Sequence, residues 1–305
     1  MRIFGFERYG GPEVQQFFEV PPPERRDGTV LVAMRAAGVN PADLKVRKGQ
    51  RQGRVPVAFP MAMGREACGI VLSADEASGL RPGHLVFGSC ASGSGALADF
   101  VLLDAKQAVA VPPQVTAVEA ACIPVAIGTA WDALDELDLE AGDTLLVLGA
   151  GGGVGSHAVQ LGRLRNLRVI GVASPGKRQL VLDLGAVHVA AGPGWTERVR
   201  AVAPEGVHGL VDTVGGEALR QSSVVLRPAG AVRSTASPAL AVELGGSGVT
   251  RRRTADTFAE VAALVAAGAL APVIGATFDF ADCADAVALV ETGHATGRTV
   301  VTNDR

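Results

Sequence analysis

Short apolar segments separated by glycine and proline fill roughly the first 115 residues of the chain. The clearest lie at residues 30–34, 67–72, 85–87 and 100–103. Apolar runs of this length that are bounded by turn residues are typical of β-strands. The pattern therefore predicts that the N-terminal part of the chain is almost entirely β-structure.

The pattern changes near residue 118, where helical and β-rich runs begin to alternate. Strands are expected at 144–148, 168–173, 187–190, 209–213 and near 231–235, and helices at 154–164 and 175–184. Ser174, Pro175 and Gly185 suit the second helix as N-cap, first helical residue and C-terminal stop. Alternation at this spacing predicts a parallel sheet with helices on both faces. Beyond residue 256, helices at 258–267 and 284–292 alternate with strands at 273–280 and 298–302.

The composition fits a soluble globular protein, with 48% hydrophobic and 19% charged residues and a formal net charge of −3. This charge, with only 4% aromatic residues, argues against a surface that binds nucleic acid or an anionic membrane. Uncharged stretches at 144–162 and 261–278 are interrupted by glycine or proline and predict no membrane span. The cysteines have no paired spacing of the kind that disulfide frameworks or zinc sites need, so we expect a cytoplasmic protein; they are Cys68, Cys90, Cys122 and Cys283.

A glycine cluster joins the strand at 144–148 to the helix at 154–164. A dinucleotide pyrophosphate needs this strand–turn–helix arrangement, because free backbone N–H groups at the positive end of a helix bind its phosphates. Gly152, which has no Cβ, lets the backbone approach the phosphates, and Gly155 lets the helix pack close to the strand. The alternative is a merely tight turn between strand and helix. We predict a dinucleotide site that contains Gly149, Gly152, Gly153, Val154 and Gly155.

The end of the next strand favours NADPH over NADH. An NAD site has Asp or Glu there to bond the ribose hydroxyls, whereas this chain continues Ala173-Ser174-Pro175-Gly176-Lys177-Arg178. A 2′-phosphate would be repelled by a carboxylate and attracted by a Lys/Arg pair. We expect Ser174, Lys177 and Arg178 to contact NADPH. The alternative, that the two cations only solvate a helix face, has more weight for Arg178 than for Lys177.

Five segments spread over nearly the whole chain carry a family resemblance. They are residues 9–14 (YGGPEV), 36–49 (AAGVNPADLKVRKG), 64–71 (GREACGIV), 128–134 (GTAWDAL) and 293–300 (GHATGRTV). In this order they resemble the medium-chain dehydrogenase/reductase superfamily, specifically its zinc-free quinone oxidoreductase, or zeta-crystallin-like, branch. Five motifs in family order are far more specific than one glycine loop.

The resemblance implies a mixed α/β fold of two domains. A GroES-like catalytic domain would consist of residues 1–117, completed by 256–305, and a Rossmann NADP(H)-binding domain of residues 118–255 would be inserted between them. The active site of that architecture lies in the interdomain cleft. Family dimers imply a homodimer in which the last Rossmann strand, near 231–235, pairs with its copy.

The same comparison argues against a zinc enzyme. Zinc-dependent members have a catalytic cysteine where this chain has Asn40, and a His-Glu pair where it has Arg65 and Glu66. Arginine cannot ligate zinc, and the four-cysteine structural lobe is missing. We therefore expect no metal.

Without a metal, hydride transfer needs the nicotinamide held against an electron-poor carbon and a polar group near the acceptor oxygen. Asn40 could donate a hydrogen bond to that oxygen or to the cofactor, or it could be only a turn residue before Pro41. By resemblance Thr129 lies beside the nicotinamide; its alternative is a helix N-cap. Lys45 could protonate or polarise a substrate.

Three arginine and aspartate residues complete the predicted set. Arg298, in the last family segment, is expected among the cofactor contacts. Asp43 and Arg47 are expected to make structural ion pairs.

Quinones and conjugated enones suit such a site, since charge delocalises into the ring or the enolate, whereas an unactivated ketone would need a Lewis acid. We therefore expect an NADPH-dependent, zinc-independent oxidoreductase that reduces quinones or enones. An enoyl-type double-bond reductase and a non-catalytic NADPH-binding protein remain the alternatives.

Overall fold

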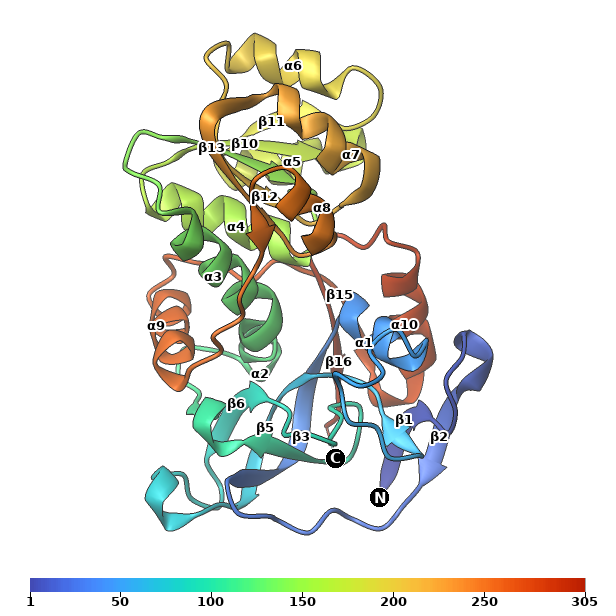
Figure 1. Ribbon diagram of the computed structural model, residues 1–305. Coiled ribbons are helices and arrows are strands. Elements are labelled where there is room, and N and C mark those ends of the chain that lie inside the picture. Colours follow the sequence, from blue (N-terminus) through green and yellow to red (C-terminus); the bar gives the residue numbers. More distant parts are fainter. Residues whose placement is uncertain (305) are drawn as a thin grey trace. The chain divides into compact units, whose positions relative to one another are not determined.

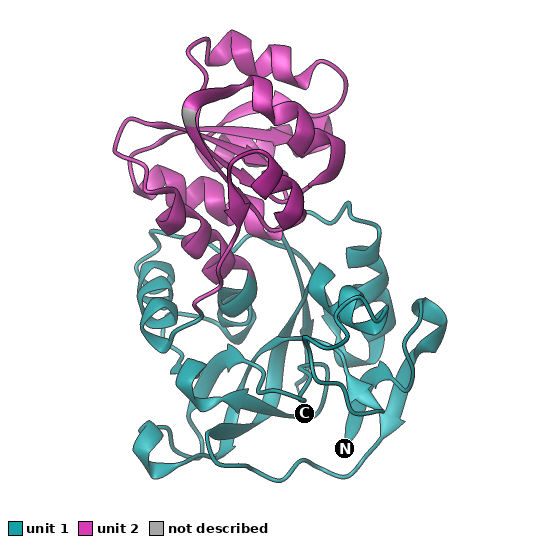
Figure 2. Ribbon diagram, in the orientation of Figure 1, with its two compact units in different colours: residues 1–125, 253–305 teal, residues 126–252 magenta. Residues whose placement is uncertain are grey.

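The computed structural model describes residues 1–304, apart from the side chain of Ala229. The chain divides into two compact units (Figure 2). Unit 1 consists of residues 1–125 together with those from 253 onward, and unit 2 of residues 126–252. Unit 2 is thus inserted into unit 1, with boundaries after residues 125 and 252 where the sequence suggested 117 and 255.

Unit 1 is built mainly of β-strands, as the short apolar runs predict (Figure 1). Its strands are β1 (Arg2–Phe6), β2 (Gln15–Glu19), β3 (Thr29–Val39), β4 (Met61–Ala62), β5 (Glu66–Ser73), β6 (Leu85–Ser89), β7 (Phe100–Asp104), β8 (Val109–Ala110), β15 (Ile274–Asp279) and β16 (Arg298–Thr302). Its helices are α1 (Pro41–Arg47), α2 (Ala117–Ala120), α9 (Ala255–Ala266) and α10 (Cys283–Glu291), with 3-10 turns η1 (Pro12–Val14), η2 (Glu76–Ser78), η3 (Ala105–Gln107) and η7 (Phe280–Asp282). The four predicted N-terminal runs lie within β3, β5, β6 and β7.

The two ends of the chain meet in one sheet of unit 1. Its seven strands follow the order β15-β16-β3-β5-β6-β8, with β7 also paired to β3, and a second sheet has the order β2-β1-β4. The C-terminal β16 runs antiparallel to β3, with Thr299 opposite Val39 and Val301 opposite Ala37. This pairing brings Arg298, at the start of β16, to the end of β3 and so to the start of α1.

Unit 2 is a parallel sheet with accompanying helices. Its strands are β9 (Thr144–Leu148), β10 (Arg168–Ala173), β11 (Val187–Ala190), β12 (Val207–Asp212), β13 (Leu226–Ser234) and β14 (Ser247–Gly248). Its helices are α3 (Gly128–Leu137), α4 (Gly153–Leu164), α5 (Arg178–Asp183), α6 (Trp195–Val202), α7 (Gly216–Gln221) and α8 (Pro238–Glu243), with 3-10 turns η5 (Pro175–Lys177) and η6 (Ser222–Val224). The order β11-β10-β9-β12-β13-β14 is that of a Rossmann fold, whose strand order reverses between β9 and β12.

Two features of unit 2 differ from the sequence expectation. Strand β13 is not the edge of the sheet, because Arg233 and Ser234 pair with Ser247 and Gly248 of β14. The strand expected to join two copies at residues 231–235 is therefore already covered in part, and β14 forms the edge. Ser174 holds the N-cap position of η5 but makes no side-chain capping hydrogen bond.

The helical run that contains α2 and α3 is continuous. A π-helical turn, η4 (Ile123–Ile127), links them, so residues Ala117–Leu137 form one helix of 21 residues. By length and composition this helix could cross a membrane, but 78% of its most apolar window is buried within the protein. Burial of this extent is what a core helix shows.

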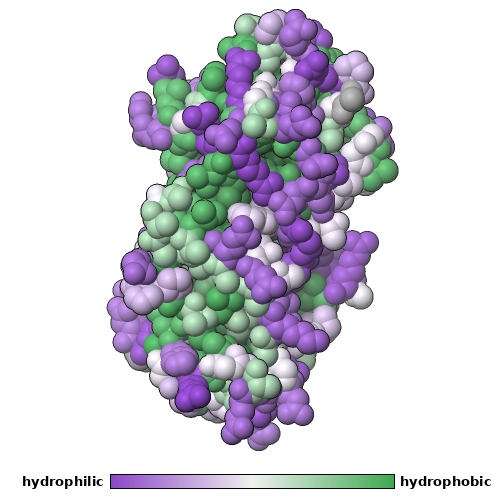
Figure 3. Space-filling model, turned by 90° about the vertical axis from the view of Figure 1, so that its left-hand side faces the viewer, coloured by the Kyte–Doolittle hydropathy of each residue, from purple (hydrophilic) through white to green (hydrophobic). Residues whose placement is uncertain are grey.

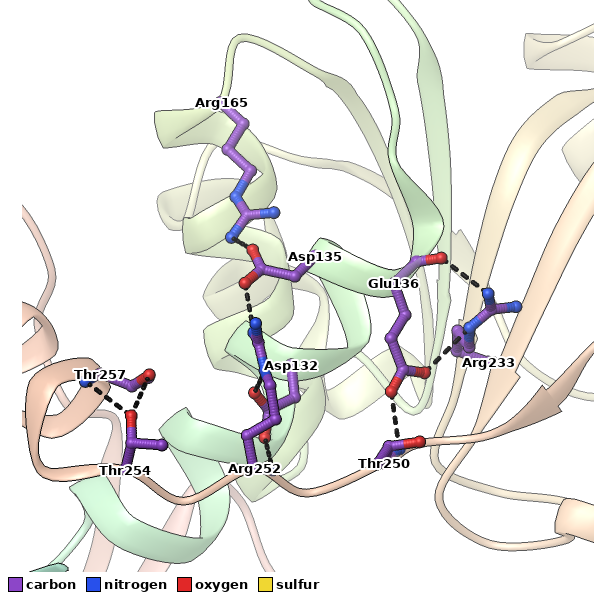
Figure 4. A network of polar contacts seen from close by, with 9 residues as sticks. All are labelled: Asp132, Asp135, Glu136, Arg165, Arg233, Thr250, Arg252, Thr254 and Thr257. Atoms are coloured by element: carbon purple, nitrogen blue, oxygen red, sulfur yellow. Dashed lines mark hydrogen bonds and ion pairs between the residues drawn. The ribbon is translucent and has the colours of Figure 1, made fainter.

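Polar contacts tie α3 to the last residues of unit 2 (Figure 4). The buried Asp132 carboxylate accepts hydrogen bonds from the backbone N–H of Arg252 at 2.9 Å and from its Nε at 2.8 Å. Glu136 accepts from Arg233 Nε at 3.0 Å and from the N–H of Thr250 at 2.8 Å. The segment that leads out of unit 2 is thereby fixed to one helix.

Candidate functional site

The glycine loop between β9 and α4 has the geometry that the sequence predicts. Gly149 has φ +82°, and a Cβ there would lie 2.2 Å from Thr213 Oγ1, so only glycine fits. A Cβ on Gly155 would lie 2.1 Å from the Gly149 carbonyl oxygen, so α4 packs directly on the loop. Gly152 is the N-cap residue of α4, which begins at Gly153 and continues through Val154.

Gly152 differs from its neighbours, because the protein itself leaves space beside it. A Cβ there would meet only the Gly149 carbonyl oxygen, at an ordinary 3.4 Å. Packing therefore does not require glycine at this position, whereas a close-lying ligand would. The first N–H groups of the twelve-residue α4 also lack intrahelical partners. Together these residues fit a dinucleotide pyrophosphate.

The predicted 2′-phosphate residues follow the end of β10 and differ in placement. Ser174 and Arg178 are exposed, whereas Lys177 is half-buried. The Lys177 stem lies on the glycine loop: a Cβ on Gly151 would fall 2.4 Å from Lys177 Cδ. Burial lowers the pKa of Lys177. The structure therefore brings Lys177 into contact with the loop, whereas Arg178 is exposed, and no acid stands at this strand end.

Sequence reasoning missed a second loop beside the first. Asp212, at the end of β12, is fully buried and accepts hydrogen bonds from the backbone N–H groups of Val214 at 2.9 Å and Gly215 at 2.8 Å. Thr213 Oγ1 donates to the carbonyl oxygen of Leu148 at 2.8 Å, which holds this loop against the glycine loop. Val214 is left 56% exposed. The signal was available as Asp-Thr-Val-Gly-Gly directly after a predicted strand.

Thr129 lies inside the continuous helical run and is 2% exposed. The residue before it continues the helix from η4, so the N-cap interpretation of Thr129 is wrong. Its Oγ1 lies 3.4 Å from Nε of Arg251, within unit 2.

Asn40 and Arg298 meet in a buried polar network of unit 1. Asn40 Nδ2 donates to Glu66 Oε1 at 2.9 Å and to the carbonyl oxygen of Gly38 at 3.2 Å, and Arg298 Nη1 donates to Asn40 Oδ1 at 2.8 Å. Arg298 Nη2 also contacts Glu66, whose Oε2 accepts from the N–H of Val125 at 2.7 Å. Asn40 and Arg298 are each 3% exposed. The Asn40 amide thus bonds to three groups within unit 1, and its contact with an acceptor or cofactor stays a prediction.

Helix α1 holds the remaining candidates. Arg47 makes the expected ion pair, with Nη2 2.8 Å from Glu291 Oε1. The expectation is wrong for Asp43, which pairs with no arginine of residues 1–304: its Oδ2 accepts the backbone N–H of Asn40 at 2.8 Å, a contact that starts α1. Lys45 is half-buried on the same helix.

A pocket of about 240 Å³ lies within unit 1. Its polar lining comprises Asp43, Arg54, Arg65, Cys90, Ser92, Ser94 and Arg253, and apolar side chains such as Phe6 and Met63 complete it. The lining includes neither Asn40 nor Lys45. Burial raises the pKa of the Cys90 thiol, so it is not a nucleophile at neutral pH.

Among the described residues, no group of three or more His, Cys, Asp and Glu side chains could hold a metal ion. The four cysteines are free thiols. Glu66 is committed to Asn40, Arg298 and Val125, and its neighbour Arg65 lines the pocket. Independence from metal stays a prediction.

Two protein families match parts of the chain. Residues 26–113 match the family described as alcohol dehydrogenase GroES-like domain, and residues 184–301 match the family described as zinc-binding dehydrogenase. The first falls within unit 1, and the second runs from unit 2 into the C-terminal part of unit 1.

Curated relatives align with nearly the whole chain. The spectinabilin polyketide synthase system protein NorB of Streptomyces orinoci is 32% identical over 96% of this chain, which spans only 14% of the length of NorB. The 2-methylene-furan-3-one reductase of Solanum lycopersicum is 28% identical over 99% of this chain and 79% of its own length. The chloroplastic NADPH-dependent alkenal/one oxidoreductase of Arabidopsis thaliana is 27% identical over the same shares.

Solved structures of similar proteins have the same fold. The quinone oxidoreductase from Coxiella burnetii is 25% identical, with a TM-score of 0.90 and 99% of both chains covered. A mycobacterial protein solved as a complex with NADPH is 27% identical, with a TM-score of 0.86 and 99% of both chains covered. Two findings identify the family. The fold is a GroES-like unit with a Rossmann unit inserted, and the relatives are quinone oxidoreductases and enone reductases. The chain belongs to the medium-chain dehydrogenase/reductase superfamily, in its zinc-free branch, and is an oxidoreductase of the NAD(P)H-dependent type.

Proposed function

We propose that the protein is an NADPH-dependent, zinc-independent oxidoreductase that reduces quinones or conjugated enones. The observation that carries the cofactor assignment is Lys177, which lies on Gly151 of the glycine loop at a strand end that has no acid. A cation at this place attracts the 2′-phosphate of NADPH, and a carboxylate that would hold the ribose of NADH is missing. Two of the similar proteins support the assignment, since their descriptions name NADPH.

Each residue of the proposed cofactor site has a defined task. Gly153, Val154 and Gly155 present the backbone N–H groups at the start of α4 to the pyrophosphate. The N–H groups of Gly149 and Gly152 donate to carbonyl oxygens of the protein, so Gly149 shapes the turn and Gly152 leaves room for the phosphates. Ser174, Lys177 and Arg178 offer one hydroxyl and two cations for the 2′-phosphate. When bound, NADPH supplies a hydride. For the acceptor, the names of relatives support the class, because two of them reduce alkenals, enones or a furanone.

The cofactor assignment is tested by fluorescence titration of NADPH and NADH. Lys177→Ala should weaken NADPH binding by roughly 1–3 kcal/mol, the range of a charge-assisted hydrogen bond, and leave NADH binding nearly unchanged. Lys106→Ala, an exposed lysine in unit 1, is the matched control and should alter neither affinity. Equal affinities of the unmutated protein for the two cofactors would overturn the assignment.

A non-catalytic NADPH-binding protein is the alternative from a different class. Such a protein would bind NADPH with the same preference but would not oxidise it when a quinone or enone is added. An acceptor-dependent loss of NADPH absorbance separates the two.

A further inference from the structure

The unit 1 pocket contains a single carboxylate, that of Asp43, among three arginines, Arg54, Arg65 and Arg253. Nothing in the proposed cofactor site uses this pocket. A pocket with a few convergent polar groups on a partly apolar lining is what a small-molecule site requires.

Asp43 is the most unusual polar residue of the lining. It is 3% exposed, and its Oδ2 accepts the backbone N–H of Asn40 at 2.8 Å. Its Oδ1 is buried and has no hydrogen-bond partner among the described residues. Leaving such an oxygen unpaired costs about 1–3 kcal/mol, so a native protein retains it where it has a use. A protonated Oδ1 would be a hydrogen-bond donor that is not committed to the protein.

The surroundings of Asp43 favour its protonated form near neutral pH. Burial raises the pKa of Asp43 to about 7, with the negative charge of Glu66 acting in the same direction. The N–H of Asn40 and the positive charges of Arg65 and Arg298 oppose this rise. The groups that act on Asp43 lie at the start of α1, at the start of β5 and in β16. The Cys90 thiol, which follows β6, also faces Asp43 but stays neutral because burial raises its pKa. The carboxyl group can therefore exchange a proton in the physiological range.

Arg65 supplies the complementary charge. Its side chain is half-buried, lines the pocket, and makes no hydrogen bond or ion pair within the described part of the chain. Its charge nevertheless acts on Asp43. A guanidinium held without a partner can stabilise negative charge that develops on a carbonyl oxygen.

We infer that the unit 1 pocket binds a small conjugated enone, that Asp43 is the acid that protonates it, and that Arg65 stabilises its oxygen. The inference rests on the proposed function and names the pocket in which its acceptor binds. A volume of about 240 Å³ lies below the roughly 300–1,000 Å³ common for ligand pockets, which suits a small acceptor with a short chain or one ring.

The reaction balances in one hydride and one proton. The β-carbon of the enone gains a hydride supplied by bound NADPH, and the C=C electron pair moves onto the carbonyl oxygen as an enolate beside Arg65. The Asp43 O–H bond breaks as its proton is transferred to the α-carbon, and the C=O bond forms again. NADP⁺ and the Asp43 carboxylate remain, and the carboxylate recovers a proton from water. A quinone needs no such acid, because its reduced oxygens take protons from water.

The test uses Asp43→Asn, which keeps an oxygen to accept the Asn40 N–H but cannot donate as an acid. Turnover of 2-methylcyclohex-2-enone and of 1,4-benzoquinone is measured with NADPH from pH 5 to 9, together with the enantiomeric excess at the α-carbon of the enone product. NADPH affinity is measured by fluorescence and folding by thermal unfolding. Asp285→Asn, an exposed aspartate on α10, is the matched control.

The inference predicts that enone kcat/KM falls about 100-fold in Asp43→Asn, the lower end of the usual contribution of a general acid, while benzoquinone reduction falls less than about 10-fold. The unmutated protein should lose enone activity as the pH rises through about 7, and the variant should lose both this pH dependence and the enantiomeric excess. An active protein whose Asp43→Asn variant keeps its enone turnover, pH profile and enantiomeric excess would overturn the inference alone. An unmutated protein that binds NADPH but reduces neither acceptor would overturn the proposed function, and the inference with it.

Discussion

Three polar side chains from distant parts of unit 1 pair with one another in its core. Asn40, Glu66 and Arg298 share hydrogen bonds, and Gly38 leaves the space for them, since a Cβ there would lie 2.3 Å from Arg298 Nη2 and 2.4 Å from Glu66 Oε1. Removing one partner leaves the others buried and unpaired, which costs more than the hydrogen bond itself is worth. The network therefore stabilises the junction of β3, α1 and β16.

We expect Asn40→Ala to lower the free energy of unfolding by about 1–3 kcal/mol, because Arg298 and Glu66 each lose a buried partner. Chemical denaturation measures it, and NADPH affinity should stay unchanged. Gln114→Ala, at an exposed position of unit 1, is the control. An Asn40→Ala protein of unchanged stability whose quinone kcat/KM falls 10- to 1000-fold would instead place the amide at the acceptor oxygen.

Asp43 should make stability depend on pH in one direction. Because burial raises its pKa to about 7, the folded state holds a proton that the unfolded chain releases near pH 4. The stabilising contribution of the protonated form is complete below about pH 4 and is lost as the pH rises to about 7, at no more than about 1.4 kcal/mol per pH unit. Relative to Asp43→Asn, the unmutated protein should therefore become less stable between pH 4 and 7. Denaturation curves at several pH values that keep a constant difference would contradict this.

At the residue scale the sequence predicted backbone features better than side-chain contacts. The glycine loop was recognisable because Gly149, Gly152 and Gly155 follow a strand at fixed spacing, and local geometry determines their role. The partners of Asn40 lie 26 and 258 positions away along the chain, at Glu66 and Arg298. Local spacing carries no information about such pairs, so the sequence left the role of Asn40 open among an acceptor contact, a cofactor contact and a turn residue.

The Asp132 contacts of α3 illustrate how one helix fixes the segment that follows β14. Asp132 is 1% exposed, whereas Asp135, one turn further along α3, has a side chain that is 30% exposed and contacts Arg165 and Arg252. Burial raises the pKa of Asp132. Burial also acts to raise the pKa of Asp135, but hydrogen bonds from Arg252 and Arg165 outweigh it and hold that pKa below its usual value.

Replacing the buried Asp132 should cost more than replacing the half-buried Asp135. We expect Asp132→Ala to lower the free energy of unfolding by about 1–3 kcal/mol, because the backbone N–H of Arg252 loses its acceptor. Asp135→Ala, the matched control on the same helix, should cost at most about 1 kcal/mol, since ion pairs that water still reaches contribute little. Urea denaturation of both variants measures the difference, and equal losses would show that burial does not govern this network.

At the element scale the strands were predicted most accurately. The bounds of β9, β10, β11 and β16 are those that the hydrophobic pattern indicates, because each is an apolar run between turn residues. The joined helix α2–η4–α3 was not foreseen, since Pro124 reads as a break and the π-helical turn around it leaves no sequence signal. Strand β14 has only Ser247 and Gly248, which have low β-propensity, and it forms because β13 lies beside it.

At the scale of the whole molecule, apolar surface is available for a partner copy. On the face in Figure 3 hydrophobic residues reach the surface in patches between hydrophilic side chains. In unit 2, Val242 on α8 is 63% exposed, and α8 packs beside the edge strand β14. Sheet edges and exposed apolar residues favour association with a second chain.

We expect a homodimer, with the β14 edge of unit 2 in the contact rather than β13. Light scattering over a range of concentrations measures the mass. Val242→Asp should weaken the dimer, because it places a charge on the exposed apolar surface of α8. A mass of one chain at every concentration would contradict the prediction.

The central claim, reduction of a quinone or enone by NADPH without metal, is tested most directly by one steady-state measurement. The protein is depleted of metal by exhaustive chelation, its metal content is checked by elemental analysis, and NADPH absorbance is followed after addition of 9,10-phenanthrenequinone or 2-methylcyclohex-2-enone. We predict acceptor-dependent oxidation of NADPH, slower with NADH, at a rate that chelation leaves unchanged. NADPH binding without acceptor-dependent oxidation, or activity lost on chelation and restored by zinc, would contradict the account.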